Sequence, residues 1–138
     1  MYTQQGGEGP DLLVLLHGMG ATGAVWSPLI AEAGARWHGR WLALDLPGHG
    51  HSAPQASYAV GQLAASVAQA VLPHADPAGR LIVLGHSLGG VVGLGLATGW
   101  FGLQPHRVFG AGIKVAWTEE ELQRMQALAA QPPRRFAT

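Results

Sequence analysis

The chain has 138 residues, of which 48% are hydrophobic and 12% charged, so it can bury a core and is not intrinsically disordered. Eight basic residues balance eight acidic ones without forming a basic patch, which argues against nucleic-acid binding. The absence of cysteine excludes disulfides and thiolate metal sites. The first residues lack the charged and apolar blocks of a signal peptide, so we expect a cytoplasmic location.

Short apolar runs alternate with segments of helical periodicity along the whole chain. In chain order, we expect strands over residues 11–16, 41–44, 81–84 and 107–115, each followed by a helix, over 27–34, 58–72, 88–100 and 118–130. This alternation predicts an α/β fold, with a mostly parallel sheet and helices on both faces. In such sheets the ligand site lies at the carboxyl ends of the strands.

Polar residues mark the expected helix starts. Ser27 precedes Pro28 and Ser57 precedes the second helical run, so both serines are predicted N-caps. Thr118 and Glu121 have the spacing of a capping box. Residues 81–105 contain no charged side chain, but glycines interrupt them, so we interpret them as a buried strand and helix rather than a membrane span.

A serine motif, Gly85-His-Ser87-Leu-Gly89, connects the third strand to the third helix. Glycines two positions on either side of a serine fit a very sharp strand-to-helix turn, where larger side chains would collide with the adjoining strand and helix. Such a turn exposes the serine hydroxyl and directs the amide of Leu88 toward a developing oxyanion. The motif predicts a nucleophilic serine.

A competing glycine pattern lies earlier in the chain. Gly18, Gly20 and Gly23 match the spacing of a dinucleotide-binding loop, and Asp45 ends the next strand, where a ribose-binding acid would lie. His17 before the first glycine and the elaborate turn after Asp45 are untypical of such a site. A Rossmann-type dinucleotide-binding module therefore remains an alternative.

Three segments together resemble the α/β-hydrolase family. They are His17-Gly-Met-Gly20, similar to its oxyanion-hole loop, Asp45-Leu-Pro-Gly-His-Gly-His-Ser52, similar to its Asp-x-Pro-Gly-His-Gly-x-Ser loop, and the serine motif, similar to its nucleophile elbow. The resemblance implies that Ser87 is the nucleophile and that the backbone amides of Met19 and Leu88 form the oxyanion hole. It implies structural or pocket-lining roles for His17 and His86.

The chain departs from the family pattern after Ser87, where the triad acid and then the histidine should follow. No aspartate follows, and His106, the one later histidine, begins a strand at the wrong end of the sheet. We expect residues 119–121 to be helix-terminal charges. We also expect the antiparallel strands that begin the family sheet, and its last strands, to be missing, so the sequence predicts a partial α/β-hydrolase fold.

The resemblance implies a serine hydrolase of the esterase type, acting on a small-molecule ester or similar acyl bond without cofactor or metal. We expect residues 1–117 to form the partial core and residues 118–138 to begin a helical lid or a truncated C-terminal segment. As it stands, the chain should be an inactive fragment. A lyase, perhydrolase or oxygenase of the same fold is the other alternative. The aromatic side chains of Trp26 and Trp117 are expected in the core.

Overall fold

The computed structural model describes residues 1–34 and 36–132. Its strands are β1 (Thr3–Gly6), β2 (Leu12–Leu16), β3 (Arg40–Leu44), β4 (Leu81–His86) and β5 (Arg107–Ala111). Its helices are α1 (Ser27–Ala33), α2 (Val60–Val71), α3 (Leu88–Ala97) and α4 (Glu119–Ala129), with short 3-10 turns η1 (Gly23–Trp26) and η2 (Leu72–His74). The end of the expected lid segment, residues 133–138, lies outside the described residues.

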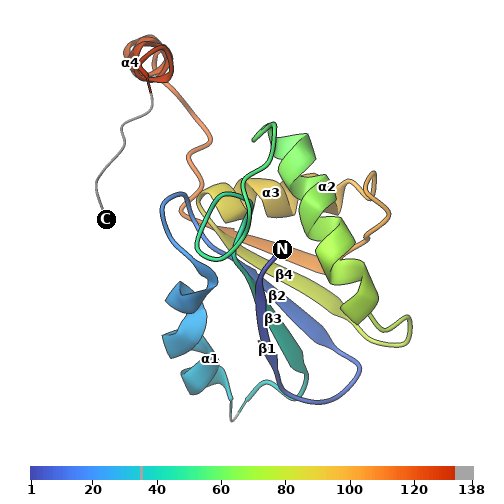
Figure 1. Cartoon of the computed structure of the whole chain (residues 1–138). Coiled ribbons are helices and arrows are strands. Elements are labelled where there is room, and N and C mark those ends of the chain that lie inside the picture. The colour runs from blue at the N-terminus through green and yellow to red at the C-terminus, as the bar shows by residue number, and fades with distance from the viewer. Residues whose placement is uncertain (35, 133–138) are drawn as a thin grey trace.

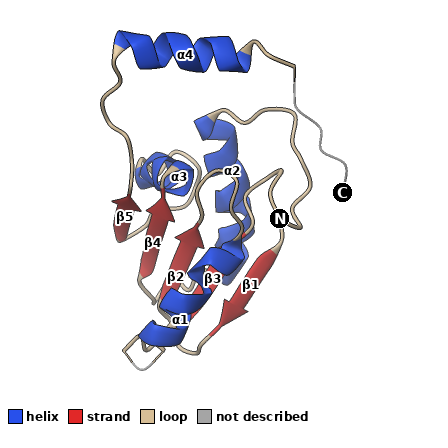
Figure 2. Cartoon of the chain, turned by 90° about the vertical axis from the view of Figure 1, so that its left-hand side faces the viewer, coloured by secondary structure: helices blue, strands red, loops and turns tan. Residues whose placement is uncertain are grey.

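The strands form one sheet in the order β1-β3-β2-β4-β5 (Figure 2). β2, β3, β4 and β5 are parallel, which confirms the predicted mostly parallel sheet. β1 pairs antiparallel with β3, with Thr3 opposite Leu44 and Gly6 opposite Trp41. The expectation that the sheet lacks an antiparallel starting strand is therefore wrong. β1 was missed because its sequence, Thr-Gln-Gln-Gly, has none of the apolar residues that mark a buried strand.

Helices cover both faces of the sheet, with α1 on one face and α2 and α3 on the other (Figure 1). The core lies between the sheet and α2 and α3, where Val14, Leu42 and Val83 from the strands meet Leu63 and Leu96 from the helices. These five side chains are at most 1% exposed. Burying each of them stabilises the fold by about 1.5–3 kcal/mol, so this layer holds the strand ends in place.

Helix starts differ from the sequence prediction at two places. Ser27 is the first residue of α1 rather than its N-cap, because the 3-10 turn η1 leads directly into the helix from Trp26. Ser57 does not cap α2, which begins at Val60 after the extended residue Ala59. The Ser57 hydroxyl accepts a hydrogen bond from the amide of Ala59 at 3.3 Å, so it closes a local turn instead.

The C-terminal part of the described chain leaves the sheet after β5. Gly112, with a φ of 62°, ends the strand four residues before its expected end at residue 115. α4 lies beyond the carboxyl ends of the strands, apart from the other helices (Figures 1 and 2). None of its residues is buried, and the predicted capping box of Thr118 and Glu121 is present. None of the helices among the described residues has the length and apolar character needed to cross a bilayer.

Candidate functional site

Ser87 lies at a sharp turn between β4 and α3, at the carboxyl edge of the sheet. Its backbone has φ 49° and ψ −113°, and it is the only non-glycine residue with positive φ in the described chain. Such a conformation costs about 1–3 kcal/mol and persists only where the surrounding structure enforces it. The Ser87 amide donates to the carbonyl of Ala111 at 2.8 Å, which ties the turn to the end of β5.

The two glycines of the serine motif are required by close backbone contacts. A Cβ added at Gly85 would overlap the carbonyl oxygen of Gly89 in the first turn of α3. A Cβ added at Gly89 would lie 2.6 Å from the carbonyl oxygen of His17 and would overlap that of Leu16. The close backbone contacts expected from the sequence pattern are therefore present. Because glycine has no Cβ at these two positions, α3 can start directly against the end of β2.

The loop after β2 lies beside this turn. A Cβ added at Gly18 would be 3.3 Å from the Cβ of Ser87 and 2.8 Å from Nδ1 of His86. Met19 follows at the surface, with 75% of its area exposed, and Leu88 opens α3. The first amides of a helix have no intrahelical partner, so the amide of Leu88 is available to an anion. The segments in which the sequence predicts the nucleophile and the oxyanion hole therefore meet at one edge of the sheet.

Asp45 organises the loop after β3 from a buried position, with 2% of its area exposed. Its Oδ1 accepts from the amide of Gly23 at 2.7 Å, and its Oδ2 accepts from the amide of His51 at 2.9 Å. Burial alone would raise the pKa of this carboxyl, but these two backbone donors hold it below its usual range. The Ser52 hydroxyl also donates to the carbonyl of Asp45 at 2.6 Å.

The hydrogen bonds of Asp45 argue against the dinucleotide-binding alternative. Gly23 and Asp45, the last glycine and the acid of that pattern, are hydrogen-bonded to each other. Both carboxylate oxygens of Asp45 therefore serve loop structure, and because the residue is buried neither is accessible to a ribose hydroxyl. The geometry disfavours a Rossmann-type site.

The residues after Ser87 that could act as a triad base or acid lie away from the serine or take part in structural hydrogen bonds. His106 lies at the amino end of the sheet, where its Nδ1 accepts from the amide of Leu81 at 3.1 Å. Glu121 caps α4 and pairs with Lys114; the hydrogen bond from Lys114, with that from the Thr118 amide, lowers the pKa of Glu121. Among the described residues after Ser87, no acid–histidine pair completes a triad at the turn.

Two tryptophans differ from the core positions expected for them. Trp117 is 48% exposed, and the Lys114 amine lies 4.8 Å from the centre of its ring. Trp26 is half-buried, and its indole nitrogen, although buried, has no hydrogen-bond partner within the described part of the chain.

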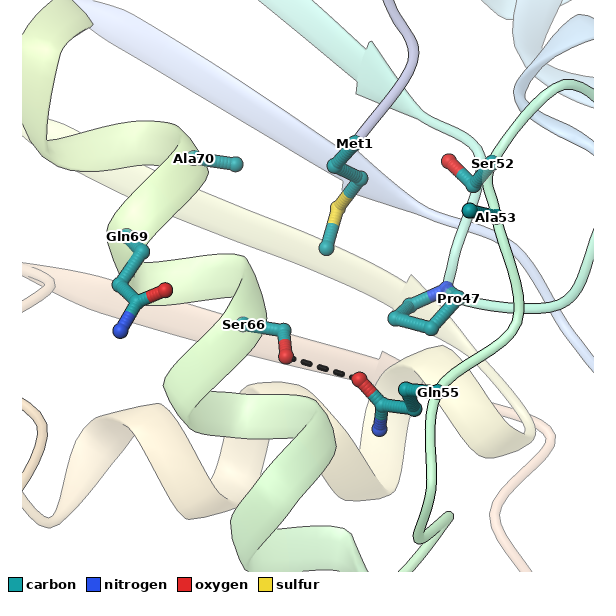
Figure 3. Close-up of a pocket in the computed structure, with 8 residues that line it drawn as sticks. All are labelled: Met1, Pro47, Ser52, Ala53, Gln55, Ser66, Gln69 and Ala70. Carbon is teal, nitrogen blue, oxygen red and sulfur yellow. Dashed lines mark hydrogen bonds between the residues drawn. The ribbon is translucent and has the colours of Figure 1, made fainter.

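A cavity of about 360 Å³ lies between the N-terminus, the loop after β3 and α2 (Figure 3). Met1 and Pro47 line it, and across it the Ser66 hydroxyl donates to the side-chain oxygen of Gln55 at 2.9 Å. Ser87 is not among its lining residues, so this cavity is separate from the serine turn.

Comparison with known proteins gives consistent matches. A family model described as "Alpha/beta hydrolase family" matches residues 13–138. A pimeloyl-[acyl-carrier protein] methyl ester esterase of Vibrio vulnificus is 40% identical over 97 residues, covering 70% of this chain and 34% of the relative. The corresponding esterase of Aeromonas hydrophila is 44% identical over 93 residues, covering 66% and 33%. The chain thus spans about a third of the length of these curated relatives.

A solved structure shares the fold at lower sequence identity. A thermophilic esterase from Thermogutta terrifontis superposes with a TM-score of 0.75 at 20% identity, covering 93% of this chain and 46% of that one. The predicted partial fold, a mostly parallel sheet with helices on both faces, is confirmed.

Proposed function

The chain belongs to the alpha/beta hydrolase family, and we propose that Ser87 is the nucleophile of an esterase site with an oxyanion hole formed by the amides of Met19 and Leu88. The observation that carries this proposal is the strained backbone of Ser87, at φ 49°, between β4 and α3 and beside Gly18. Strain of this kind concentrates at functional sites, so its presence at the half-buried Ser87 supports a functional role for the hydroxyl.

The proposed reaction is acyl transfer through the serine. The Ser87 oxygen attacks the ester carbonyl carbon, and its proton passes to a general base. The carbonyl oxygen becomes an oxyanion, to which the amides of Leu88 and Met19 donate. The ester carbon–oxygen bond then breaks, the alcohol leaves with a proton, and water releases the acid from the acyl-serine. Loss of one oxyanion donor in such sites typically costs about 10²–10³ in rate.

The base and acid for this chemistry are proposed to come from outside the 138 residues. His106 lies at the opposite end of β5 from the serine turn, and no aspartate follows Ser87. The chain by itself is therefore expected to be inactive or nearly so. We propose that α4 and the residues after it form part of a lid, because α4 lies beyond the carboxyl ends of the strands (Figure 2).

The proposed substrate class is a small-molecule ester. The relatives of 40–44% identity are named as methyl ester esterases. By analogy with them, we propose a carboxylic ester with a small alcohol group. No cofactor or metal is needed for this chemistry.

Chemical rescue with imidazole tests the proposal on the chain as it is. We expect a fluorophosphonate probe to label Ser87 slowly or not at all in buffer, and measurably faster when free imidazole supplies the missing base. Peptide mass spectrometry locates the label, with Ser87→Ala as the negative control and the exposed Ser27 as an internal reference. Rescue that is equal at Ser27 and Ser87 would contradict an activated nucleophile. Rapid labelling of Ser87 without imidazole would show that the chain is not an inactive fragment.

A further inference from the structure

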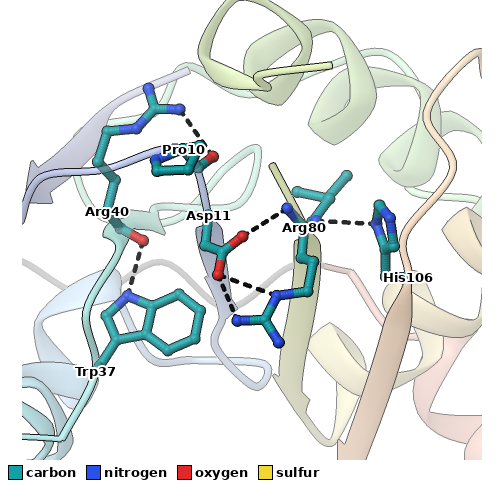
Figure 4. Close-up of polar contacts among 7 residues, drawn as sticks. Pro10, Asp11, Trp37, Arg40, Arg80 and His106 are labelled. Atoms are coloured by element: carbon teal, nitrogen blue, oxygen red, sulfur yellow. Dashed lines mark hydrogen bonds and ion pairs between the residues drawn. The ribbon is translucent and has the colours of Figure 1, made fainter. Parts of the chain in front are cut away.

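A second candidate site lies at the amino ends of β4 and β5, at the opposite edge of the sheet from Ser87. Arg80, Ile82, His106 and Arg107 line a cavity of about 220 Å³ there, which we call the basic pocket. Figure 4 shows Arg80 and His106 side by side in this region. Three of the four lining side chains carry nitrogen donors and none is acidic, which is the composition of an anion site.

Arg80 is held in place by Asp11 at the start of β2. Its guanidinium Nε and Nη2 lie 3.0 and 2.5 Å from Oδ2 of Asp11, and its backbone amide donates to Oδ1 at 2.7 Å. A guanidinium has five N–H donors, and Asp11 takes two of them, so about three remain for a ligand. The ion pair thus fixes the orientation of the guanidinium without using up its donors.

His106 presents a further donor. Its backbone amide donates to the carbonyl of Leu81 at 2.7 Å, and its Nδ1 accepts from the Leu81 amide at 3.1 Å. A neutral imidazole that accepts at Nδ1 carries its proton on Nε2, so this ring offers an N–H. Both contacts are with the first residue of β4, and they fix the ring at the amino end of that strand.

Arg107 supplies the net charge of the basic pocket. It is the first residue of β5, it is paired in register with Ile82, and it is exposed. No ion pair to Arg107 is present among the described residues. Because Arg80 and Asp11 compensate each other, Arg107 leaves the pocket with one uncompensated positive charge.

We propose that the basic pocket binds a phosphate group, either as free phosphate or as a phosphate monoester. Donors from two guanidinium groups and one imidazole approach from three residues, which exceeds what the two oxygens of a carboxylate need and suits the three or four oxygens of a phosphate. Ile82 forms an apolar wall beside these donors. Phosphate binding at this pocket does not depend on ester cleavage, so it can be tested separately from the function proposed for Ser87.

Titration of the ¹⁵N-labelled chain with inorganic phosphate, at constant ionic strength, tests the basic pocket. We expect saturable shifts at the amides of Leu81, His106 and Arg107, with a Kd on the order of 1–10 mM because the pocket is solvent-exposed. Arg107→Gln should weaken binding about tenfold. Arg124→Gln removes the same charge from exposed α4 and should leave the Kd unchanged.

A second variant keeps the test independent of folding. His106→Asn retains an acceptor in the place of Nδ1 for the Leu81 amide but removes the Nε2 donor, so it should weaken binding several-fold while the remaining spectrum stays native. Glycerol 3-phosphate in place of inorganic phosphate distinguishes the sources: tighter binding indicates a phosphorylated metabolite, and equal binding indicates free phosphate. Shifts confined to residues 88–90, absence of saturation, or equal Kd values for Arg107→Gln and Arg124→Gln would overturn the proposal.

Discussion

The buried imidazole of His17 accepts a hydrogen bond from the backbone amide of Leu46, with 2.9 Å between Nε2 and the amide nitrogen. Its Nδ1 lies 2.7 Å from the carbonyl oxygen of Gly18, to which it donates in this tautomer. The ring therefore connects the loop after β2, which lies beside Ser87, to the loop after β3. The sequence interpretation of His17 as a structural or pocket-lining residue remains a prediction, and this bond can be tested through the effect of pH on stability.

The free energy of unfolding should decrease as the pH falls below about 6.5, because of His17. Burial lowers the pKa of His17 from its ordinary value of 6.5, and the nearby His49 adds to this, although Gly18 and Asp45 oppose it. Below that value the unfolded chain binds a proton that the folded chain resists, so the free energy of unfolding decreases as pH falls toward the folded pKa. Urea denaturation between pH 5 and 8 should show this slope flattening above about 6.5.

His17→Gln provides the comparison, because its amide oxygen can still accept from Leu46 but cannot titrate. This variant should be less stable at pH 7.5, by about 1–2 kcal/mol, and should show a reduced slope below pH 6.5. His38→Gln, at an exposed position, should retain the wild-type slope. A slope that persists in full in His17→Gln would assign the pH dependence to other groups.

Apolar runs were sufficient to predict the parallel part of the sheet. Leu12–Leu16 and Leu81–His86 are strands that carry apolar residues on both faces of the sheet, so their composition alone marks them. The glycines of the serine motif likewise predicted a close approach that the structure contains, since Gly85 and Gly89 each leave room for a carbonyl oxygen. These features could be predicted because each has a local signature in the sequence, although the carbonyl oxygens that Gly89 approaches belong to the distant residues Leu16 and His17.

Features without a local signature in the sequence could not be predicted in this way. Thr3–Gly6 is a strand because β3 offers it a free edge, not because its own residues favour one. Asp45 matched a ribose-binding acid in spacing, but its partners Gly23 and His51 are set by how two loops pack. Trp117 was expected in the core because tryptophan is usually buried, yet it lies on the linker between β5 and α4. Composition does not report such long-range packing.

Alanine at Gly85 should destabilise the fold strongly. Its Cβ would overlap the backbone of α3, which cannot move without displacing Ser87, so we expect a loss of about 3 kcal/mol or more in the free energy of unfolding. Gly61→Ala in α2 is the matched control, since its Cβ would meet only Phe101, at 3.9 Å, and should stabilise the helix by about 0.5–1 kcal/mol. Chemical denaturation measures both changes, and equal effects would contradict a steric requirement at the turn.

Glycine at position 87 should stabilise the chain while removing the hydroxyl. Ser87 has a φ of 49°, which glycine adopts without a steric penalty, and its side chain caps no amide of α3. We expect the free energy of unfolding to rise by about 1 kcal/mol after the entropy cost of glycine is included. Ser27→Gly at the start of α1 should lower it by up to about 1 kcal/mol. A destabilised Ser87→Gly variant would indicate that the turn carries no strain.

Thr118→Ala should unfold α4 locally without weakening the core. The Thr118 hydroxyl accepts from the amide of Glu121 at 3.3 Å, and the Glu121 carboxylate accepts from the amide of Thr118 at 3.0 Å. Because no residue of α4 is buried, capping and helix propensity decide its stability. Losing the cap costs about 1 kcal/mol, which lowers the helical population several-fold.

Carbon-13 chemical shifts and amide exchange in residues 119–129 measure that population. Gln126→Ala, an exposed substitution in the same helix, should keep or raise it because alanine is the better helix former. Chemical denaturation of the sheet should be the same in both variants, because α4 lies apart from the sheet (Figure 2) and has no buried residue. If the amides of α4 stay protected in Thr118→Ala, the helix must be held by contacts with the rest of the chain, and the capping box would not decide its stability.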